Sequence, residues 1–366
     1  MPRLLVFAAA TALAVSLASI GCSSSSSSGI TSDAADGGDA GAADAAASDP
    51  DAGTATVSIH AVIDLPRTAE SHSLSATAFD PATRTLFALP DDRPSIVPLV
   101  GNEDFTAFTI GTPIAITGRP DSTWDGEGLV RVPGGYIAVT VETVPTIERF
   151  DATGARTGAV TFPAHYAKQA AGNKGLESLA ISPSGRFLFT ANESALTIDG
   201  TAATKSRGTT IRILKRELAT DTDIELAYRT EPLGAGTGSG DMGVSELAAV
   251  SDDVLLVLER GFQAGYGNTV RIFRVDLSAG TRVDAIASLS DTTPVLDKTL
   301  LVDLGSLPSD GITHPATQPN PILDNYEGLA LGPTLADGRR LLFVTSDDNA
   351  SASQVARVLV LAASGL

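Results

Sequence analysis

The chain has 366 residues and carries 43 acidic against 25 basic side chains, which gives a formal net charge of −18. This balance argues against a nucleic-acid partner, because proteins that bind nucleic acids present a basic surface to the phosphates. It also disfavours direct capture of a polyanion unless bound cations intervene.

The first 22 residues are typical of an export signal. Arg3 precedes an apolar stretch, Leu4–Ala18, which is too short to span a membrane and leads to Cys22, the only cysteine. The pattern predicts a lipoprotein signal peptide over residues 1–22 with Cys22 as the lipidated residue, and secretion without a lipid is the alternative. Because Ser23 and not Asp follows Cys22, we expect lipid anchoring in the cell envelope, at the outer membrane of a Gram-negative cell.

Residues 23–56 consist mainly of Ser, Ala, Asp and Gly and contain almost no large apolar side chain. Such a segment cannot bury enough apolar surface to offset the entropy that ordering costs. We therefore expect a disordered, acidic tether between the anchor and the folded domain.

Residues 57–366 are rich in short apolar runs bounded by Gly, Pro, Asp or Asn, which predicts an all-β domain. One pattern recurs along it: an acid, a short strand, a polar turn, a second strand and a final acid. Three copies are EGLVRVPGGYIAVTVE, ESLAISPSGRFLFTANE and ELAAVSDDVLLVLE. A fourth, EGLALGPTLADGRRLLFVTSDD, begins at Glu327, and a degenerate copy with Ser75 in place of the first acid spans Ser73–Asp92.

Repeats of this kind indicate a β-propeller, whose blades take roughly 40–50 residues of four strands each. At about 50 residues per blade, the length of the domain predicts a single propeller of six blades, with seven as the alternative. The first and last apolar strands, TVSIHAVIDL and VARVLVLA, are expected to share one blade and thereby close the ring.

The repeat places acids at both ends of a strand–turn–strand unit. If the first strand of each repeat lines the central channel, the leading and trailing acids meet at one mouth of that channel. The expected leading acids are Glu127, Glu177, Glu246 and Glu327, and the expected trailing acids are Glu142, Glu193, Glu259, Asp347 and Asp348.

These repeats resemble the phytase-like family, also described as the family with esterase-like activity of phytase. The resemblance rests on DGEGL, NKGLESLAISPSGRFLFTANE, GVSELAAVSDDVLLVLERGF, GNTVRIFRVDL and NYEGLALGPTLADGRRLLFVTSDDN, and it covers nearly all of residues 57–366. It implies a secreted or periplasmic propeller, similar in architecture to calcium-dependent propeller phytases, with phosphoester or ester hydrolysis as the activity. The chain departs from the pattern at HSLSATAFD, which lacks the usual Gly-Leu, and at Ala350, where an aromatic residue is usual.

Closely spaced carboxylates repel one another unless a cation binds, their pKa values rise or amide groups donate to them. Calcium suits such an oxygen-rich site, and we expect it as the possible cofactor; structural ties between blades and direct acid–base catalysis are the alternatives. The expected metal ligands are Glu127, Glu177, Glu193, Glu246, Glu259, Glu327, Asp347 and Asp348, and the catalytic candidates are Glu127, Glu177, Glu246 and Glu327.

Lys174 and Arg260 flank these acids and are the candidates for binding a substrate phosphate, although salt bridges to the acids are the alternative. Two functions therefore stay open at this point. The chain is a monomeric, calcium-dependent phosphoesterase or esterase that acts on a small anionic ester at the cell envelope, or it is a non-catalytic propeller lipoprotein that binds an envelope ligand or a protein.

Overall fold

The computed structural model describes residues 55–120, 122–142 and 144–366. The signal peptide over residues 1–22, the lipidation candidate Cys22 and the tether up to residue 54 lie outside the described residues. Within the described part, no helix is both long and apolar enough to cross a membrane.

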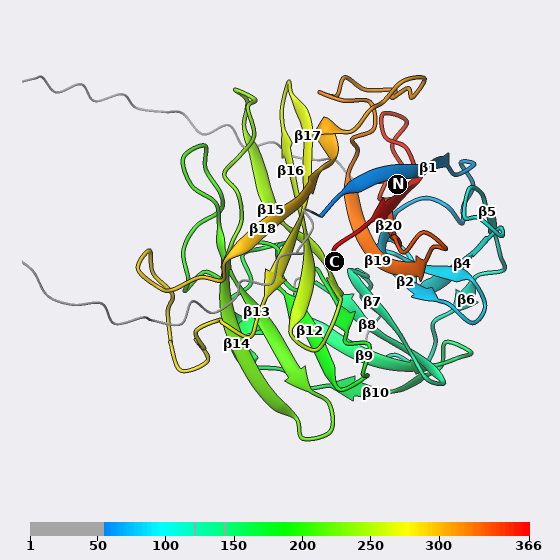
Figure 1. The fold of residues 1–366 in the computed structure, drawn as a ribbon. Coiled ribbons are helices and arrows are strands. Elements are labelled where there is room, and N and C mark those ends of the chain that lie inside the picture. The colour runs from blue at the N-terminus through cyan, green and yellow to red at the C-terminus, as the bar shows by residue number, and fades with distance from the viewer. Residues whose placement is uncertain (1–54, 121, 143) are drawn as a thin grey trace, which may run out of the picture. The chain divides into compact units, whose positions relative to one another are not determined.

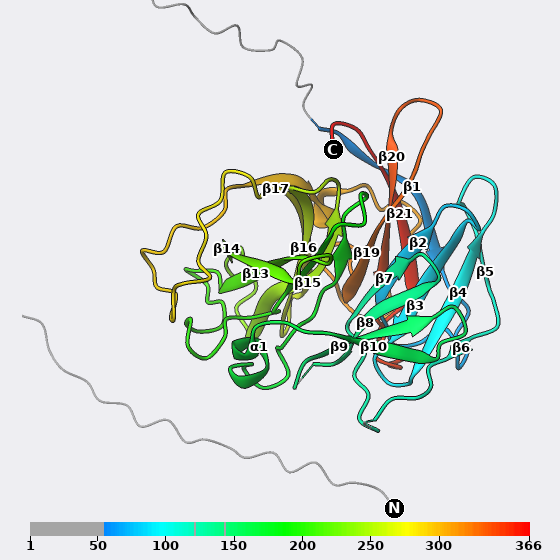
Figure 2. The ribbon, with the colours of Figure 1, turned by 90° about the horizontal axis from the view of Figure 1, so that it is seen from below.

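The described chain forms a single β-propeller of five blades, each a twisted antiparallel sheet (Figures 1 and 2). Blade 1 contains β2 (Leu74–Asp80), β3 (Thr85–Pro90), β4 (Ser95–Gly101), β5 (Phe108–Ile110) and β6 (Ile114–Ala115). Blade 2 contains β7 (Gly128–Val132), β8 (Gly135–Val141), β9 (Thr146–Asp151) and β10 (Arg156–Val160).

A short helix, α1 (Ala164–Lys168), leads to blade 3, and a 3₁₀ turn, η1 (Leu304–Ser306), follows blade 4. Blade 3 contains β11 (Ala180–Ile181), β12 (Phe187–Ala191), β13 (Thr210–Glu217) and β14 (Thr222–Arg229). Blade 4 contains β15 (Gly240–Ala249), β16 (Val254–Gln263), β17 (Gly267–Asp276) and β18 (Lys298–Asp303). Blade 5 contains β19 (Tyr326–Thr334), β20 (Arg340–Ser346), β21 (Arg357–Ala363) and β1 (Val57–Asp64).

The prediction of six or seven blades was wrong, because the length of a typical blade does not apply to this chain. Long connections lengthen blades 3 and 4 and the passage to blade 5, at residues 192–209, 277–297 and 307–325. The five copies of the repeat, the degenerate one included, each supply the first two strands of one blade. Counting repeats therefore gives the blade number, whereas dividing the length does not.

The expected closure of the ring is confirmed. β1 pairs with β21 in antiparallel register from Val57 opposite Ala363 to Asp64 opposite Arg357. The blue first strand lies beside the red last strands in both views (Figures 1 and 2). Arg357 is buried and binds Asp64 through two nitrogens, at 2.6 and 3.1 Å, so the closing strand is held by charge as well as by its ladder.

The innermost strand of each blade is the first strand of its repeat. These strands, β2, β7, β11, β15 and β19, lie next to one another in a ring around the central channel. Apolar side chains fill the spaces between neighbouring blades; one cluster joins blades 4 and 5 through Leu258, Tyr326 and Leu342. This packing fixes the five inner strands and hence the groups at their ends.

Candidate functional site: an acidic cavity at one end of the channel

The inner strands carry carboxylates at the end where they enter the channel. Glu127 directly precedes β7, Glu327 is the second residue of β19, and Ser75 holds that position in β2. The second strand of each hairpin runs back to the same end, so the residues that follow it also arrive there. They include Asp91 after β3, Glu142 after β8, Glu193 after β12 and Asp347 after β20.

These groups line a cavity of about 160 Å³. Eight carboxylic acids border it against two basic residues, Lys174 and Arg260. The volume accommodates a cation with a few waters but not a whole organic substrate, since sites for such ligands measure roughly 300–1,000 Å³. The acids are Asp91, Asp125, Glu127, Glu142, Glu177, Glu193, Glu327 and Asp347, and Ser75, Asn173 and Asn349 complete the lining.

The two basic side chains already have partners among the acids. Nη2 of Arg260 lies 2.9 Å from Glu327 and 3.7 Å from Glu193, and it lies 3.8 Å from Glu177. Nζ of Lys174 lies 2.8 Å from Glu193 and 2.8 Å from Asp241. The bridges hold glutamates of different blades together, but they neutralise only part of the negative charge of the cavity.

In the part of the chain that the structure describes, two groups of three carboxylates are close enough to hold a metal ion. In each group, ligand oxygens of the three residues lie within 4.8 Å of one another, and Glu142 belongs to both groups. Asp125 and Glu127 complete the first group, and Glu177 and Glu193 complete the second.

Glu142 is one of three residues of the cavity lining whose hydrogen bonding is incomplete within the described residues; Asp91 and Arg260 are the others. Its Oε1 accepts a hydrogen bond of 2.8 Å from the amide of Gly175. Its Oε2 is buried and has no partner within the described residues. A buried polar atom without a partner is costly, and here it belongs to the carboxylate that the two groups share. This atom fits a cation ligand.

Burial and mutual repulsion shift the carboxylates toward their protonated forms. Burial, followed by the charges of Glu177 and Glu327, raises the pKa of Glu127 well above its usual value. Burial also raises the pKa of Glu142 to about 8, although the Gly175 amide opposes the change. Burial and the nearby Glu327 raise the pKa of Asp347 to about 9. Without a cation, several of these groups therefore keep a proton at neutral pH.

Three expected members of the acidic ring do not line the cavity, and the expectation of a complete ring needs correction there. Glu246 accepts hydrogen bonds from the amides of Leu179 and Leu247, both at 2.9 Å, and so ties blade 4 to blade 3. Asp348 accepts from the amide of Ser73 at 3.0 Å and ties blade 5 to blade 1.

Glu259 lies on the opposite side of its strand from Arg260. It accepts from the Tyr228 hydroxyl at 2.5 Å, from Lys298 at 2.7 Å and from the amide of Glu231 at 2.8 Å. The reason is strand alternation: successive side chains point to opposite faces, and Arg260 is the residue that borders the cavity.

The structure adds acids that sequence reasoning did not include among the ligands. Asp125 lies in DGEGL, two residues before Glu127, and Asp91 is the first acid of the LPDD ending of the degenerate repeat. Glu142 was expected at the channel mouth but not among the ligands. The sequence signal for these acids is the trailing acid of each repeat. It predicts cavity residues correctly at Asp91, Glu142, Glu193 and Asp347.

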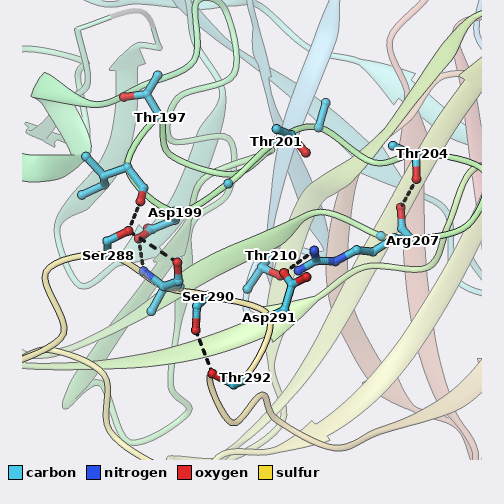
Figure 3. A pocket seen from close by; sticks show the side chains of 15 residues that line it. Thr197, Asp199, Thr201, Thr204, Arg207, Thr210, Ser288, Ser290, Asp291 and Thr292 are labelled. Atoms are coloured by element: carbon cyan, nitrogen blue, oxygen red, sulfur yellow. Dashed lines mark hydrogen bonds and ion pairs between the residues drawn. The ribbon is translucent and has the colours of Figure 1, made fainter.

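A second cavity, of about 680 Å³, lies apart from the acidic one and is formed by residues 197–210 and 288–292 (Figure 3). Its walls carry mainly hydroxyl groups and backbone. Asp291 is paired with Arg207, and Asp199 with the buried Arg212 at 2.7 Å. Because its carboxylates are paired in this way, this cavity shows no comparable cation site.

Comparison with known proteins gives one family match. The model of the family described as "Phytase-like: Esterase-like activity of phytase" matches residues 70–350, which include every residue that lines the acidic cavity. No curated protein matches the chain.

Solved structures with a similar chain path include three that are distant in sequence. A luciferin-regenerating enzyme is 14% identical with a TM-score of 0.38, over 85% of this chain and 96% of that one. The PQQ-bound aldose sugar dehydrogenase from Streptomyces coelicolor is 14% identical with a TM-score of 0.40, over 85% and 98%. A protein from Lactobacillus plantarum is 15% identical with a TM-score of 0.35, over 80% and 74%. These values carry no information about the chemistry of the cavity.

Proposed function

The chain belongs to the phytase-like family, described by the esterase-like activity of phytase, and we propose from this premise that it is a calcium-assisted hydrolase of small phosphate esters. The acidic cavity is the proposed calcium site, and only the phosphoryl group of the ester would enter it. The observation that carries the proposal is the unpartnered Oε2 of Glu142, buried between two groups of carboxylates. Hard divalent cations such as calcium bind six to eight oxygen ligands, which this arrangement can offer.

The two carboxylate groups are the proposed calcium ligands: Asp125, Glu127 and Glu142 on one side, and Glu142, Glu177 and Glu193 on the other. Bound calcium would polarise a phosphoryl oxygen and lower the pKa of a coordinated water. It would also neutralise negative charge in the cavity, because carboxylates without a counter-charge repel an anionic ester.

The other side chains have roles that follow from their contacts. Lys174 and Arg260 are the basic groups that border the cavity, and they are the proposed contacts for phosphoryl oxygens, although both are bridged to glutamates. Asp347 accepts a hydrogen bond from the amide of Asn349 at 2.7 Å and contacts neither basic group. Asp347 belongs to neither of the two carboxylate groups, and it is the proposed proton donor to the leaving alcohol.

One observation favours a second function, a calcium-binding propeller without catalysis. Lys174 and Arg260 are both engaged by carboxylates, so neither offers a cationic group that is free of acids. A single experiment separates the two functions: calcium binding and hydrolysis of p-nitrophenyl phosphate and p-nitrophenyl acetate are measured on the same sample, with calcium and with EDTA. Calcium-dependent phosphate release supports the hydrolase. Calcium binding without turnover of either ester supports the binding protein.

The place of action is part of the proposal. The signal segment and Cys22 support export and lipid anchoring in the cell envelope, at the outer membrane. The net charge supports a small-molecule partner and no nucleic acid. We propose that the protein acts there as a monomer.

A further inference from the structure

The other end of the central channel has the opposite chemistry. The five inner strands run from the acidic cavity into an open, mainly apolar funnel of about 760 Å³. The funnel is lined by the later part of every inner strand: residues 77–79 and 81, 129–131 and 133, 179–185, 247–249, and 329–334, together with Arg340. Its volume and apolar lining fall in the range of sites for small organic ligands.

A layer of buried side chains separates the funnel from the acidic cavity. Leu129, Leu179 and Leu329 each follow a cavity glutamate by two residues, and none borders that cavity. With Thr77 and Leu247 they form the inner end of the funnel, and each is at most 3% exposed. The funnel is therefore a separate compartment and not an extension of the acidic site.

The rim of the funnel is built of rigid residues. A proline lies at or just after the end of the inner strand in four of the five blades: Pro81, Pro133 and Pro183 follow β2, β7 and β11, and Pro333 is the last residue but one of β19. Proline fixes one backbone dihedral, so the opening is largely preformed. A preformed site loses less conformational entropy when a ligand binds.

The funnel contains one cationic side chain without an acidic partner. Arg340 begins β20, and its Nε donates to the carbonyl of Gly332 at 3.1 Å. Its terminal nitrogens make no hydrogen bond or ion pair within the described residues. Arg131, the other arginine of the lining, already faces Asp80 at 3.7 Å. The neighbouring Arg339 pairs with Asp337 at 2.6 Å and does not line the funnel.

We propose that this funnel is a binding site for a small amphiphilic carboxylate, with its apolar chain among the inner-strand side chains and its carboxylate on Arg340. The single unpaired guanidinium matches one negative charge, and its planar fork matches the geometry of a carboxylate. Burial lowers the pKa of Arg340, and no carboxylate among the described residues opposes this. A bound carboxylate supplies that missing partner.

The test is titration calorimetry with octanoate as the probe, in EDTA so that the acidic cavity holds no calcium. Wild-type protein binds octanoate about tenfold more tightly than hexanoate, because each buried methylene contributes about 0.8 kcal/mol. The neutral variant Arg340→Gln binds octanoate at least about tenfold more weakly, as expected for the loss of a charge-assisted hydrogen bond. The matched variant Arg339→Gln, one residue away, binds it like the wild type.

Absence of octanoate binding in the wild type overturns the proposal, and so does equal binding by Arg340→Gln and Arg339→Gln. Equal affinity for hexanoate and octanoate also overturns it, since the chain would then lie outside the funnel. The variants leave the acidic cavity intact, so calcium binding and ester hydrolysis are unchanged in both. A negative result for octanoate binding therefore leaves the proposed hydrolase untouched, and a negative result for calcium or ester hydrolysis leaves the funnel proposal untouched.

Discussion

The amide of Gly175 donates a hydrogen bond of 2.8 Å to Oε1 of Glu142, across 33 positions of sequence. This bond joins blade 2 to the segment that leads into blade 3 and fixes the orientation of the carboxylate. It leaves Oε2 buried and without a partner within the described residues. The bond therefore positions a ligand atom between two carboxylate groups.

The stability of the metal-free protein is expected to fall as pH rises from about 5 to about 9. The folded-state pKa of Glu142 is about 8 and that of Asp347 about 9, against ordinary values of 4.5 and 3.8. The folded state therefore binds more protons than the unfolded state in this range, and stability is lost as the pH passes through the raised pKa values. Thermal unfolding in EDTA measures this directly.

Calcium is expected to remove most of the loss of stability between about pH 5 and about pH 9, because a bound cation replaces the protons. Calcium affinity itself should rise by about tenfold per pH unit for each proton displaced. A melting temperature in EDTA that stays constant between pH 5 and pH 9 would contradict the raised pKa values.

Arg260→Gln is expected to destabilise the metal-free protein at pH 8 by about 3 kcal/mol, because it leaves buried carboxylates without their counter-charge. The loss should be smaller in calcium, which supplies the missing positive charge. Urea unfolding with and without calcium measures both values. Arg186→Gln is the control: Arg186 is 60% exposed and pairs at the surface, where ion pairs contribute about 0–1 kcal/mol. Equal losses for both variants would show that Arg260 is not coupled to the acidic cavity.

Removal of Val57–Leu65 is expected to lower the free energy of unfolding by at least about 4 kcal/mol, since it deletes β1 and leaves the buried Arg357 without Asp64. The single variant Asp64→Ala should account for only about 1 kcal/mol of that loss, because Asp64 is 51% exposed and Arg357 keeps its backbone acceptors. Ser58→Ala, which removes only a hydrogen bond from Arg339 near the surface, is the control. If the truncated protein unfolds at the same urea concentration as the full domain, β1 does not close the ring.

Cys22→Ser is expected to abolish incorporation of labelled palmitate in a bacterial host and to move the protein from the membrane fraction to the soluble fraction. The expectation follows from the export signal and the position of the only cysteine. Unchanged labelling would refute lipidation at this residue. An unlabelled wild-type protein that is still exported would support secretion without an anchor.

The sequence predicts the fold class, the closing strand pair and the end of the channel where the acids gather, because all three follow from the strand–turn–strand repeat. The blade number could not be obtained from the length, since connections such as residues 277–297 add length without adding strands. The spacing between the acid and the following leucine already indicates that Glu246 differs from the other leading acids. Leu129, Leu179 and Leu329 each follow the first acid of their repeat by two residues. Leu247 follows Glu246 by only one.

That one-residue difference turns the side chain to the other face of the strand. The register irregularity that contains Ser75 in blade 1 and Glu327 in blade 5 contains Ser245 in blade 4, so Glu246 lies one position beyond the place of the cavity residues. The pairing of Lys174 and Arg260 with particular acids could not be predicted, because it depends on side chains that approach from different blades.

The most direct test of the calcium site is titration calorimetry of the wild type, Glu142→Gln and Glu246→Gln with calcium at pH 7.5. Glutamine keeps the shape of Glu142 and its bond to the Gly175 amide, but it removes the charge, and the metal-free variant should melt close to the wild type. The wild type should bind calcium with release of protons, Glu142→Gln should bind it at least about tenfold more weakly, and Glu246→Gln should match the wild type. If the wild type gives no binding heat, or if Glu142→Gln binds calcium as the wild type does, the acids of the cavity are structural ties and the calcium-assisted hydrolase is refuted.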